Sequence, residues 1–256
     1  MSVNTYLQNL GSSLVLSSYE KSSISTSVDT IKSRLSLYFD DVTEKKLYGS
    51  YVRGTILPRK ADEKSDVDFL VVFDNPYGYQ PQSFLNKLKN FAEYYYSQSE
   101  IHQSSPTIVL ELNHIKFELT PAYKEDGQYC IPQNSSNWMY TDPDGFSLKL
   151  TDCNKKNNNV IKPVVRILKY WNIKKNSRDL ASYFLEKKIA NELLYAYISC
   201  TSYTDYLKYA LKKIKYDTNY KNVNKALECI DEALQLEKDG YPYSALSKIK
   251  KAFPEI

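Results

Sequence analysis

Two short motifs decide the fold: Gly49-Ser50 and, after residues 51–65, Asp66-Val67-Asp68. The second motif begins an apolar run that ends at Phe73. The run VDFLVVF is β-prone and predicts a buried strand. Side chains two residues apart on a strand share a face, so Asp66 and Asp68 would project together. Paired carboxylates can hold Mg²⁺, and two such ions clamp the attacking and leaving oxygens of a phosphoryl transfer. The competing interpretation is a strand end whose acids simply sit in water.

The pair Gly49-Ser50 follows a short β-prone run and predicts a phosphate-binding turn. Glycine lets the backbone approach a phosphate closely, and Ser50 adds a hydroxyl. A short helix over 51–55 would aim its first amides at an anion. Gly-Ser alone is a weak signal, and the downstream acids make it informative.

A third carboxylate comes from Glu118, in the β-prone run 115–119 that forms a predicted hairpin with 107–112. If that strand lies beside the Asp66 strand, Glu118 completes a three-carboxylate site and can serve as general base. Glu111 offers the same chemistry one strand earlier, and spacing does not separate the two. A solvent-facing glutamate is the other interpretation.

The rest of the pattern predicts an α+β protein: a mixed sheet with helices, followed by an all-helical half. Helical periodicity marks 24–38 and 83–96 in the first half, and 121–159 lacks it and is expected to be irregular. We predict domains at 1–158 and 159–256, with the active-site cleft between them. The second half is expected to hold helices at 160–172, 182–200, 203–215, 221–237 and 242–252.

The helix at 160–172 carries Lys162, Arg166 and Lys169 at spacings of four and three. Residues so spaced share one side of a helix, where three cations could neutralise a triphosphate. A solvated basic face explains the same spacing equally well.

Composition excludes several classes of protein. The 256 residues carry a net charge of +4 and four scattered cysteines without a CxxC pair, which argues against a zinc site or a disulfide framework. Neither GxxxxGK[ST] nor GxGxxG occurs, which excludes a P-loop and a dinucleotide fingerprint. Without a signal-like N-terminal pattern or a long apolar run, we expect a cytoplasmic protein that needs neither membrane nor stable nucleic-acid binding.

Five motifs together resemble a known family. They are Tyr48–Thr55, Ser65–Asp68, Glu118–Tyr123, Trp138 with Thr141–Pro143, and Leu168–Asn172. In this order they resemble the bacterial signalling nucleotidyltransferases related to cyclic GMP-AMP synthase and oligoadenylate synthase, which have the DNA polymerase β fold.

The resemblance implies roles for individual residues. Asp66 and Asp68 would bind two Mg²⁺ ions, with Mn²⁺ as an alternative, and Glu118 would bind the catalytic one. Ser50 of the Gly49-Ser50 turn and Lys169 would contact the triphosphate. The family usually has Asp where this chain has Glu118, so the longer arm must reach the metal differently.

The implied reaction joins ribonucleoside triphosphates, ATP among them, into a cyclic or short linear oligonucleotide and releases pyrophosphate. The product would activate an effector protein, often in anti-phage defence. The alternatives are a toxin-like enzyme that modifies a protein or tRNA, and a silent nucleotide-binding module. The cluster of acids argues against the silent module, because such a module needs no costly group of carboxylates.

Overall fold

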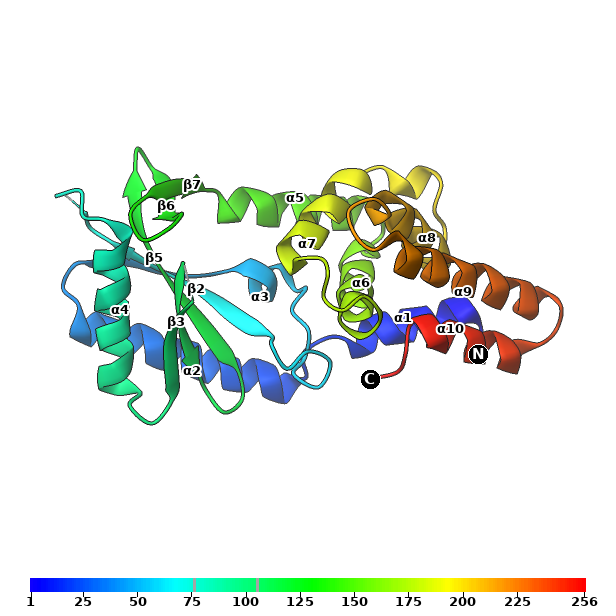
Figure 1. Cartoon of the computed structure of the whole chain (residues 1–256), viewed down its shortest axis with the longest axis horizontal. Helices are drawn as coiled ribbons and strands as arrows, with labels where there is room; N and C mark the ends of the chain where they lie inside the picture. The colour runs from blue at the N-terminus through cyan, green and yellow to red at the C-terminus, as the bar shows by residue number, and fades with distance from the viewer. Residues whose placement is uncertain (76, 105) are drawn as a thin grey trace. The chain divides into compact units, whose positions relative to one another are not determined.

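The computed structural model describes residues 1–75, 77–104 and 106–256 and divides into two compact units (Figure 1). The sheet unit comprises 16–59 and 64–145, and the helical unit comprises 1–15, 60–63 and 146–256. The elements of the sheet unit are α2 (Ser18–Tyr38), β1 (Val42–Tyr48), α3 (Gly49–Arg53), β2 (Asp66–Phe73), α4 (Pro81–Tyr95), β3 (Glu100–Ser104), β4 (Thr107–Glu111), β5 (Lys116–Glu125), β6 (Gln128–Pro132) and β7 (Trp138–Thr141).

The mixed sheet has the order β1-β2-β5-β4-β3. The central pair β2 and β5 is parallel, and each of the other neighbouring pairs in this order is antiparallel. The far end of β5 also pairs with β6, which pairs with β7. The parallel register sets Asp66 opposite Lys116 and Asp68 opposite Glu118. The predicted mixed sheet is therefore observed, and the condition that the Glu118 strand lies beside the Asp66 strand is met.

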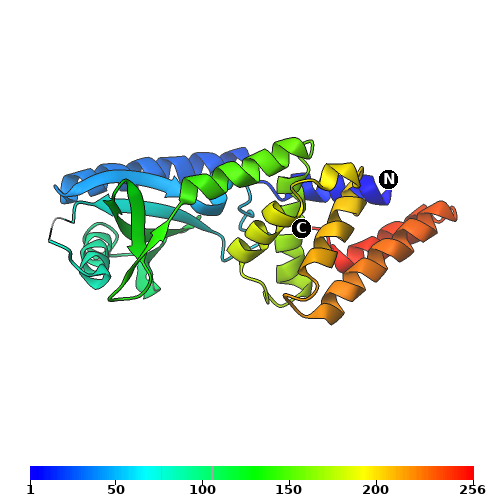
Figure 2. The same cartoon turned by 90° about the horizontal axis from the view of Figure 1, so that it is seen from above.

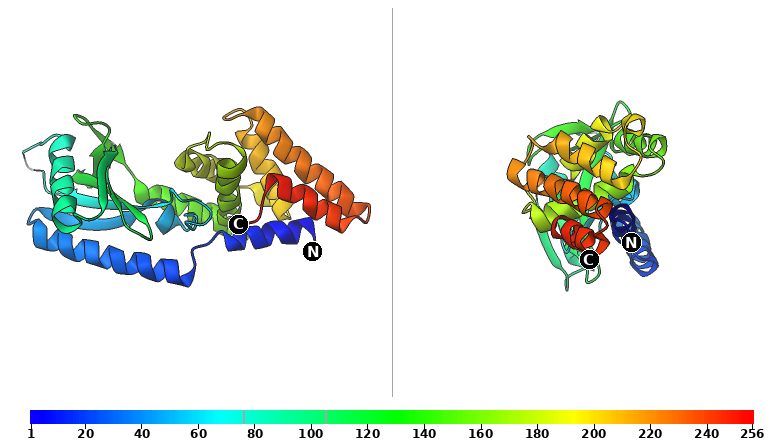
Figure 3. Two further views of the ribbon diagram at one scale, coloured as in Figure 1. Left: turned by 60° about the horizontal axis from the view of Figure 1, so that its bottom comes forward. Right: turned by 90° about the vertical axis from the view of Figure 1, so that its right-hand side faces the viewer.

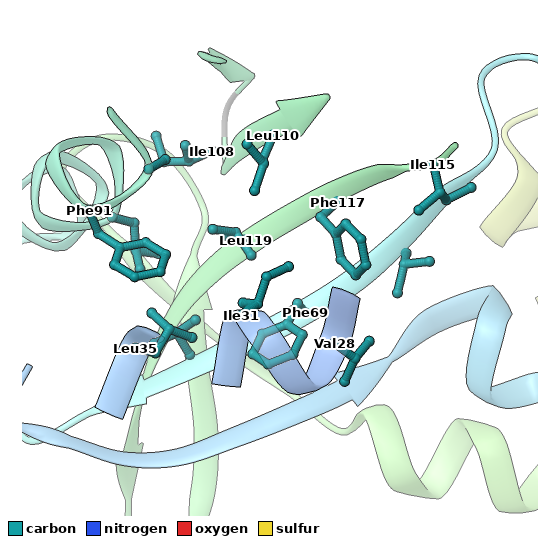
Figure 4. Close-up of a cluster of buried hydrophobic side chains, with 14 of the residues drawn as sticks. Val28, Ile31, Leu35, Phe69, Phe91, Ile108, Leu110, Ile115, Phe117 and Leu119 are labelled. Atoms are coloured by element: carbon teal, nitrogen blue, oxygen red, sulfur yellow. The ribbon is translucent and has the colours of Figure 1, made fainter. Parts of the chain in front are cut away.

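One face of this sheet is covered by α2 and α4. Alternate β2 residues Val67, Phe69, Val71 and Phe73 point to this face and are fully buried, as strand alternation requires. Side chains of α2 pack against them and against β5 (Figure 4). Burying an aromatic or aliphatic side chain contributes about 1.5–3 kcal/mol, so this face holds the unit together.

The opposite face changes character along the strands. A small apolar cluster of Leu70, Val72 and Ala122 covers one part of it. Asp66 and Asp68 of β2 continue the same alternation and therefore lie on this face. The two acids thus lie on the face of the sheet opposite to the one that α2 and α4 cover.

The helix α2 begins six residues before the predicted start at 24. Ser17 caps it, because its side chain accepts from the Glu20 N–H while the Glu20 carboxylate accepts from the Ser17 N–H. This capping box satisfies two amide donors that the helix itself cannot. The apolar spacing predicted only residues 24–38, because the buried residues of α2 begin at Ile24.

The helical unit contains α1 (Val3–Ser13), which the sequence pattern did not predict. The Tyr6 hydroxyl donates to the Phe253 carbonyl at 2.6 Å and so links α1 to the residue that follows α10. Figure 3 shows α1, in blue, beside the red α10. The remaining elements are α5 (Pro143–Lys156), α6 (Ile161–Lys175), α7 (Ser182–Glu192), the 3₁₀ turn η1 (Ala196–Ile198), α8 (Tyr203–Ile214), α9 (Tyr220–Lys238) and α10 (Pro242–Ala252). Figure 2 shows α9 and α10 side by side as a helical hairpin.

Two expectations about local structure were wrong. The stretch 121–159 is regular, because β5 continues to Glu125 and is followed by β6, β7 and α5. Many of its polar residues lie on the partly exposed strands β6 and β7 and on the partly exposed helix α5, which lack the apolar periodicity of the core. The helix predicted at 182–200 ends at Glu192, and η1 follows.

The compact units also differ from the predicted boundary between 158 and 159. Residues 1–15 pack with the helical unit, and α5 lies almost wholly in it. Composition along the chain cannot reveal this, because α1 and α6 meet only after folding. Among the described residues, no helix combines the length and apolar character needed to cross a bilayer.

Candidate functional site

The three predicted acids lie on one face of the parallel strand pair. Asp66 and Asp68 are the first and third residues of β2, and Glu118 of β5 stands in register with Asp68. Residues in register on neighbouring strands point to the same face, so Asp68 and Glu118 are direct neighbours. The strand pairing therefore brings three carboxylates together.

The carboxylate of Asp68 lies against the backbone of Gly49. A Cβ built at Gly49 would lie 1.6 Å from Asp68 Oδ2, and the backbone there has a φ of +72°. No other residue fits both the space and this left-handed conformation. The next amide, the Ser50 N–H, donates to the Asp68 carboxylate. The Gly-Ser turn thus positions Asp68.

The pKa of Asp68 is raised by its burial and by the two neighbouring acids. Burial and the negative charges of Asp66 and Glu118 raise this pKa from 3.8 to about 7. The Arg53 guanidinium and the Ser50 N–H act in the opposite direction and do not outweigh them. A carboxylate so destabilised in its charged form would gain from a nearby cation.

The other two acids of the cluster, Asp66 and Glu118, contact the Lys116 ammonium. Its Nζ lies 3.3 Å from Asp66 Oδ2 and 2.9 Å from Glu118 Oε1. Burial disfavours the charged form of Lys116, but the hydrogen bond to Glu118 and the charge of Asp66 outweigh it and raise the Lys116 pKa. Lys116 was not singled out from the sequence. The signal was its position two residues before Glu118, which puts both on one face of β5.

The donor set fits a hard divalent cation, because Mg²⁺ and Mn²⁺ prefer carboxylate oxygens. Across the described part of the chain, no three Asp, Glu, His or Cys side chains converge closely enough to form a finished metal site. Asp66 and Glu118 are instead turned to the Lys116 ammonium. The site is a carboxylate cluster that already attracts positive charge.

Glu111, the other candidate for the third acid, lies one strand further from Asp68. Glu111 ends β4 and pairs in register with Lys116 of β5, and its carboxylate is 4.0 Å from the Arg59 guanidinium. Glu118 is the glutamate adjacent to Asp68. The register therefore favours Glu118 over Glu111.

Arg166 is not on a solvated face. It is buried, and its Nε and one Nη donate to the Gly11 carbonyl at 3.2 and 3.0 Å. Burial lowers the pKa of its guanidinium to about 10. These contacts assign Arg166 a structural role in joining α6 to α1.

Lys169, on the same helix, is also buried. Its Nζ lies 3.1 Å from Glu186 Oε1, and the Glu186 carboxylate is completely buried. Lys162 is half-buried, and its backbone N–H donates to Asn154 Oδ1. Lys162, Arg166 and Lys169 thus differ in their surroundings, although their spacing along α6 is regular.

Comparisons with known proteins agree on the family. The model of the Second Messenger Oligonucleotide or Dinucleotide Synthetase domain matches residues 1–154. A "probable cyclic nucleotide synthase" of Bacillus cereus is 26% identical over 189 residues, which are 62% of this chain and 57% of that protein. The chain therefore spans little more than half the length of this relative.

Solved structures share the fold at low identity. The CdnE cyclic dinucleotide synthase of Elizabethkingia meningoseptica, solved with GTP and Apcpp, superposes with a TM-score of 0.69 at 20% identity over 85% of each chain. The CdnC protein of E. coli MS115-1, solved with ATP, gives 0.73 at 13% identity over 98% of each chain. The DncV cyclic AMP-GMP synthase of Vibrio cholerae gives 0.64 at 14% identity over 82% of this chain and 68% of DncV.

The family match covers well over half of the chain, and the mixed sheet with a helical C-terminal region matches the fold of these structures. The chain belongs to the family of the Second Messenger Oligonucleotide or Dinucleotide Synthetase domain, a family of nucleotidyltransferases.

Proposed function

We propose that this protein joins ribonucleoside triphosphates, ATP among them, into a cyclic or short linear oligonucleotide with release of pyrophosphate. The observation that carries the proposal is the placement of Asp66, Asp68 and Glu118 on one face of the parallel strands β2 and β5. The family match supports the same chemistry. The Bacillus relative is named as a cyclic nucleotide synthase, which supports a cyclic product.

The three carboxylates would hold two Mg²⁺ ions, or Mn²⁺. When bound, these ions supply charge neutralisation at the attacking and leaving oxygens. Asp68 is held by Gly49 and by the Ser50 N–H, so it needs no rearrangement to keep its position. The Ser50 hydroxyl and Lys169 would contact the triphosphate.

The chemical step would be an in-line displacement at the α-phosphorus. A ribose hydroxyl oxygen forms the new bond to phosphorus, and the bond from phosphorus to the bridging oxygen breaks to release pyrophosphate. Glu118, as general base, would take the hydroxyl proton. Its longer arm, compared with aspartate, gives its carboxylate more freedom to reach this hydroxyl.

The test is incubation of the purified protein with all four ribonucleotides and Mg²⁺ or Mn²⁺, followed by phosphatase treatment and mass spectrometry. We expect a phosphatase-resistant oligonucleotide that disappears in the Asp66→Ala/Asp68→Ala variant. Pyrophosphate release that continues undiminished in a folded double variant would remove these acids from the site. If no oligonucleotide forms, and an added acceptor protein or tRNA becomes labelled with nucleotide instead, the toxin-like reaction is favoured.

The partner that this function requires is an effector protein that binds the product, in an anti-phage system of the cytoplasm. The low net charge of +4 agrees with a small-molecule product and with no need for stable nucleic-acid binding. Addition of the purified product to a candidate effector, with its enzymatic output as the readout, tests this part independently.

A further inference from the structure

Lys116 lies where a metal ion would be expected. It opposes Asp66 across the parallel pair and shares a strand face with Glu118. Its ammonium contacts carboxylates of both strands, at 3.3 Å on β2 and 2.9 Å on β5. One positive charge therefore joins two of the three acids before any metal binds.

This pair of contacts differs from the other lysine contact on β5. The Lys116 side chain is 18% exposed, whereas Lys124 is 45% exposed and pairs with Glu44 at 2.8 Å. Exposed pairs are screened by water and contribute little, while partly buried charges act on one another strongly. Lys116 is therefore coupled more strongly to its two acids than Lys124 is to Glu44.

We propose that Lys116 is a built-in counter-cation, which holds the carboxylates of Asp66 and Glu118 in the metal-free protein and competes with the divalent metal for them. The inference rests on the proposed function, since it assumes that these acids bind metal. It makes Lys116 a positioning residue that sets the metal concentration the protein needs.

The competition follows from shared ligand atoms. Asp66 Oδ2 and Glu118 Oε1, which contact the ammonium, are oxygens that a divalent ion would use. The flexible four-carbon stem of lysine lets the ammonium swing aside when the metal enters. While it stays near, its charge repels the ion, and loss of that charge should tighten metal binding about tenfold.

The experiment titrates Mn²⁺ alone into the full-length protein and follows the loss of its free paramagnetic resonance signal. Lys116→Met is expected to lower the Mn²⁺ dissociation constant about tenfold. Lys124→Met removes a lysine from the same strand and should leave the constant unchanged. Lys116→Arg keeps the charge and should stay near the wild type.

Thermal unfolding supplies a second readout. In EDTA, Lys116→Met should melt below the wild type, because the carboxylates of Asp66 and Glu118 lose the ammonium that contacts them. With saturating Mn²⁺ the difference should vanish or reverse, since the metal replaces that charge. A merely structural lysine would lower the melting temperature equally under both conditions.

The outcomes separate the inference from the proposed function. If the wild type binds Mn²⁺, and the folded Lys116→Met variant binds it with the same affinity or more weakly, the counter-cation role of Lys116 is overturned. The proposed metal site then stands. If neither protein binds Mn²⁺ at millimolar concentration, the proposed metal site falls and the inference falls with it. Binding by Lys116→Met that exceeds the wild type supports both.

Discussion

Asp68 and Gly49 act as one structural unit at the scale of single residues. The carboxylate of Asp68 fills the volume that a side chain at position 49 would need. The strand end and the turn are therefore mutually dependent, and a change in either displaces the central acid of the cluster. This explains physically why Gly-Ser and Asp-Val-Asp occur together in one site.

Replacing Gly49 with Ala should therefore abolish oligonucleotide synthesis. The new Cβ would meet Asp68 Oδ2 at 1.6 Å. A non-glycine residue at positive φ adds strain of about 1–3 kcal/mol. Mass spectrometry of the product and urea unfolding should both report the loss.

The matched control is Gly54→Ala. Gly54 has a similar φ of +69°, but a Cβ there would meet nothing within 4 Å. Its unfolding free energy should fall by about 1 kcal/mol, while synthesis is retained. Equal activity in the two variants would contradict the link between Gly49 and Asp68.

Lys169 should contribute to stability as well as to nucleotide affinity. Lys169→Met removes an ammonium 3.1 Å from the completely buried carboxylate of Glu186. Breaking a buried pair in this way costs about 3–5 kcal/mol, so denaturant unfolding should show a large loss. Lys169→Met/Glu186→Gln should recover much of that loss. Unchanged ATP affinity in the folded double variant would exclude Lys169 from the triphosphate site.

At the scale of elements, the sequence predicted those parts that follow from local rules. The strands carrying Asp66 and Glu118 had clear apolar patterns and were found. The helices predicted in the second half were also found, except that the one predicted at 182–200 ends at Glu192. That β2 and β5 lie side by side could be stated only as a condition for the site. Their parallel pairing joins residues about fifty positions apart, which local sequence patterns do not reveal. Lys116 was missed for the same reason, since its contact with Asp66 depends on that pairing.

Helix α6 shows the opposite failure, where a regular pattern misled. Spacing alone grouped Arg166 with Lys169 and Lys162 on a cationic face. Arg166 instead binds the Gly11 carbonyl of α1, an element that was not predicted. Charge spacing identifies a face of a helix but not the neighbour that covers it.

Replacing Arg166 with Met tests this assignment. The Gly11 carbonyl would lose both N–H donors of Arg166. Leaving a buried acceptor without its donors lowers the free energy of unfolding by about 1–3 kcal/mol. We expect a lower melting temperature with unchanged ATP affinity. The exposed Lys175, also on α6, gives the control Lys175→Met, which should change neither quantity. Weaker ATP binding by Arg166→Met alone would restore the phosphate role.

At the scale of the whole molecule, the helical unit is assembled from separate stretches of chain. Residues 1–15, 60–63 and 146–256 belong to it, while the sheet unit uses the stretches between them. The hydrogen bond from Tyr6 to the Phe253 carbonyl links residues 247 positions apart. Stability of the helical unit therefore depends on contacts of long sequence separation.

Tyr6→Phe should weaken this unit selectively. Loss of the buried 2.6 Å hydrogen bond to Phe253 should cost about 1 kcal/mol. Hydrogen exchange followed by mass spectrometry should show faster exchange in α1 and α10 and unchanged exchange in β2 and β5. Equal acceleration in both units would indicate that the chain unfolds as one body.

The distribution of the helical unit along the chain has a consequence during translation. The residues of α1 leave the ribosome before the sheet unit, whereas α6, α8 and α10, against which α1 packs, are synthesised after it. The nascent sheet unit can close as soon as β5 to β7 emerge, whereas α1 must wait with its apolar side uncovered. The growing polypeptide would therefore form its carboxylate cluster before α1 reaches its final packing partners, and α1 is the segment that a chaperone would bind in the meantime.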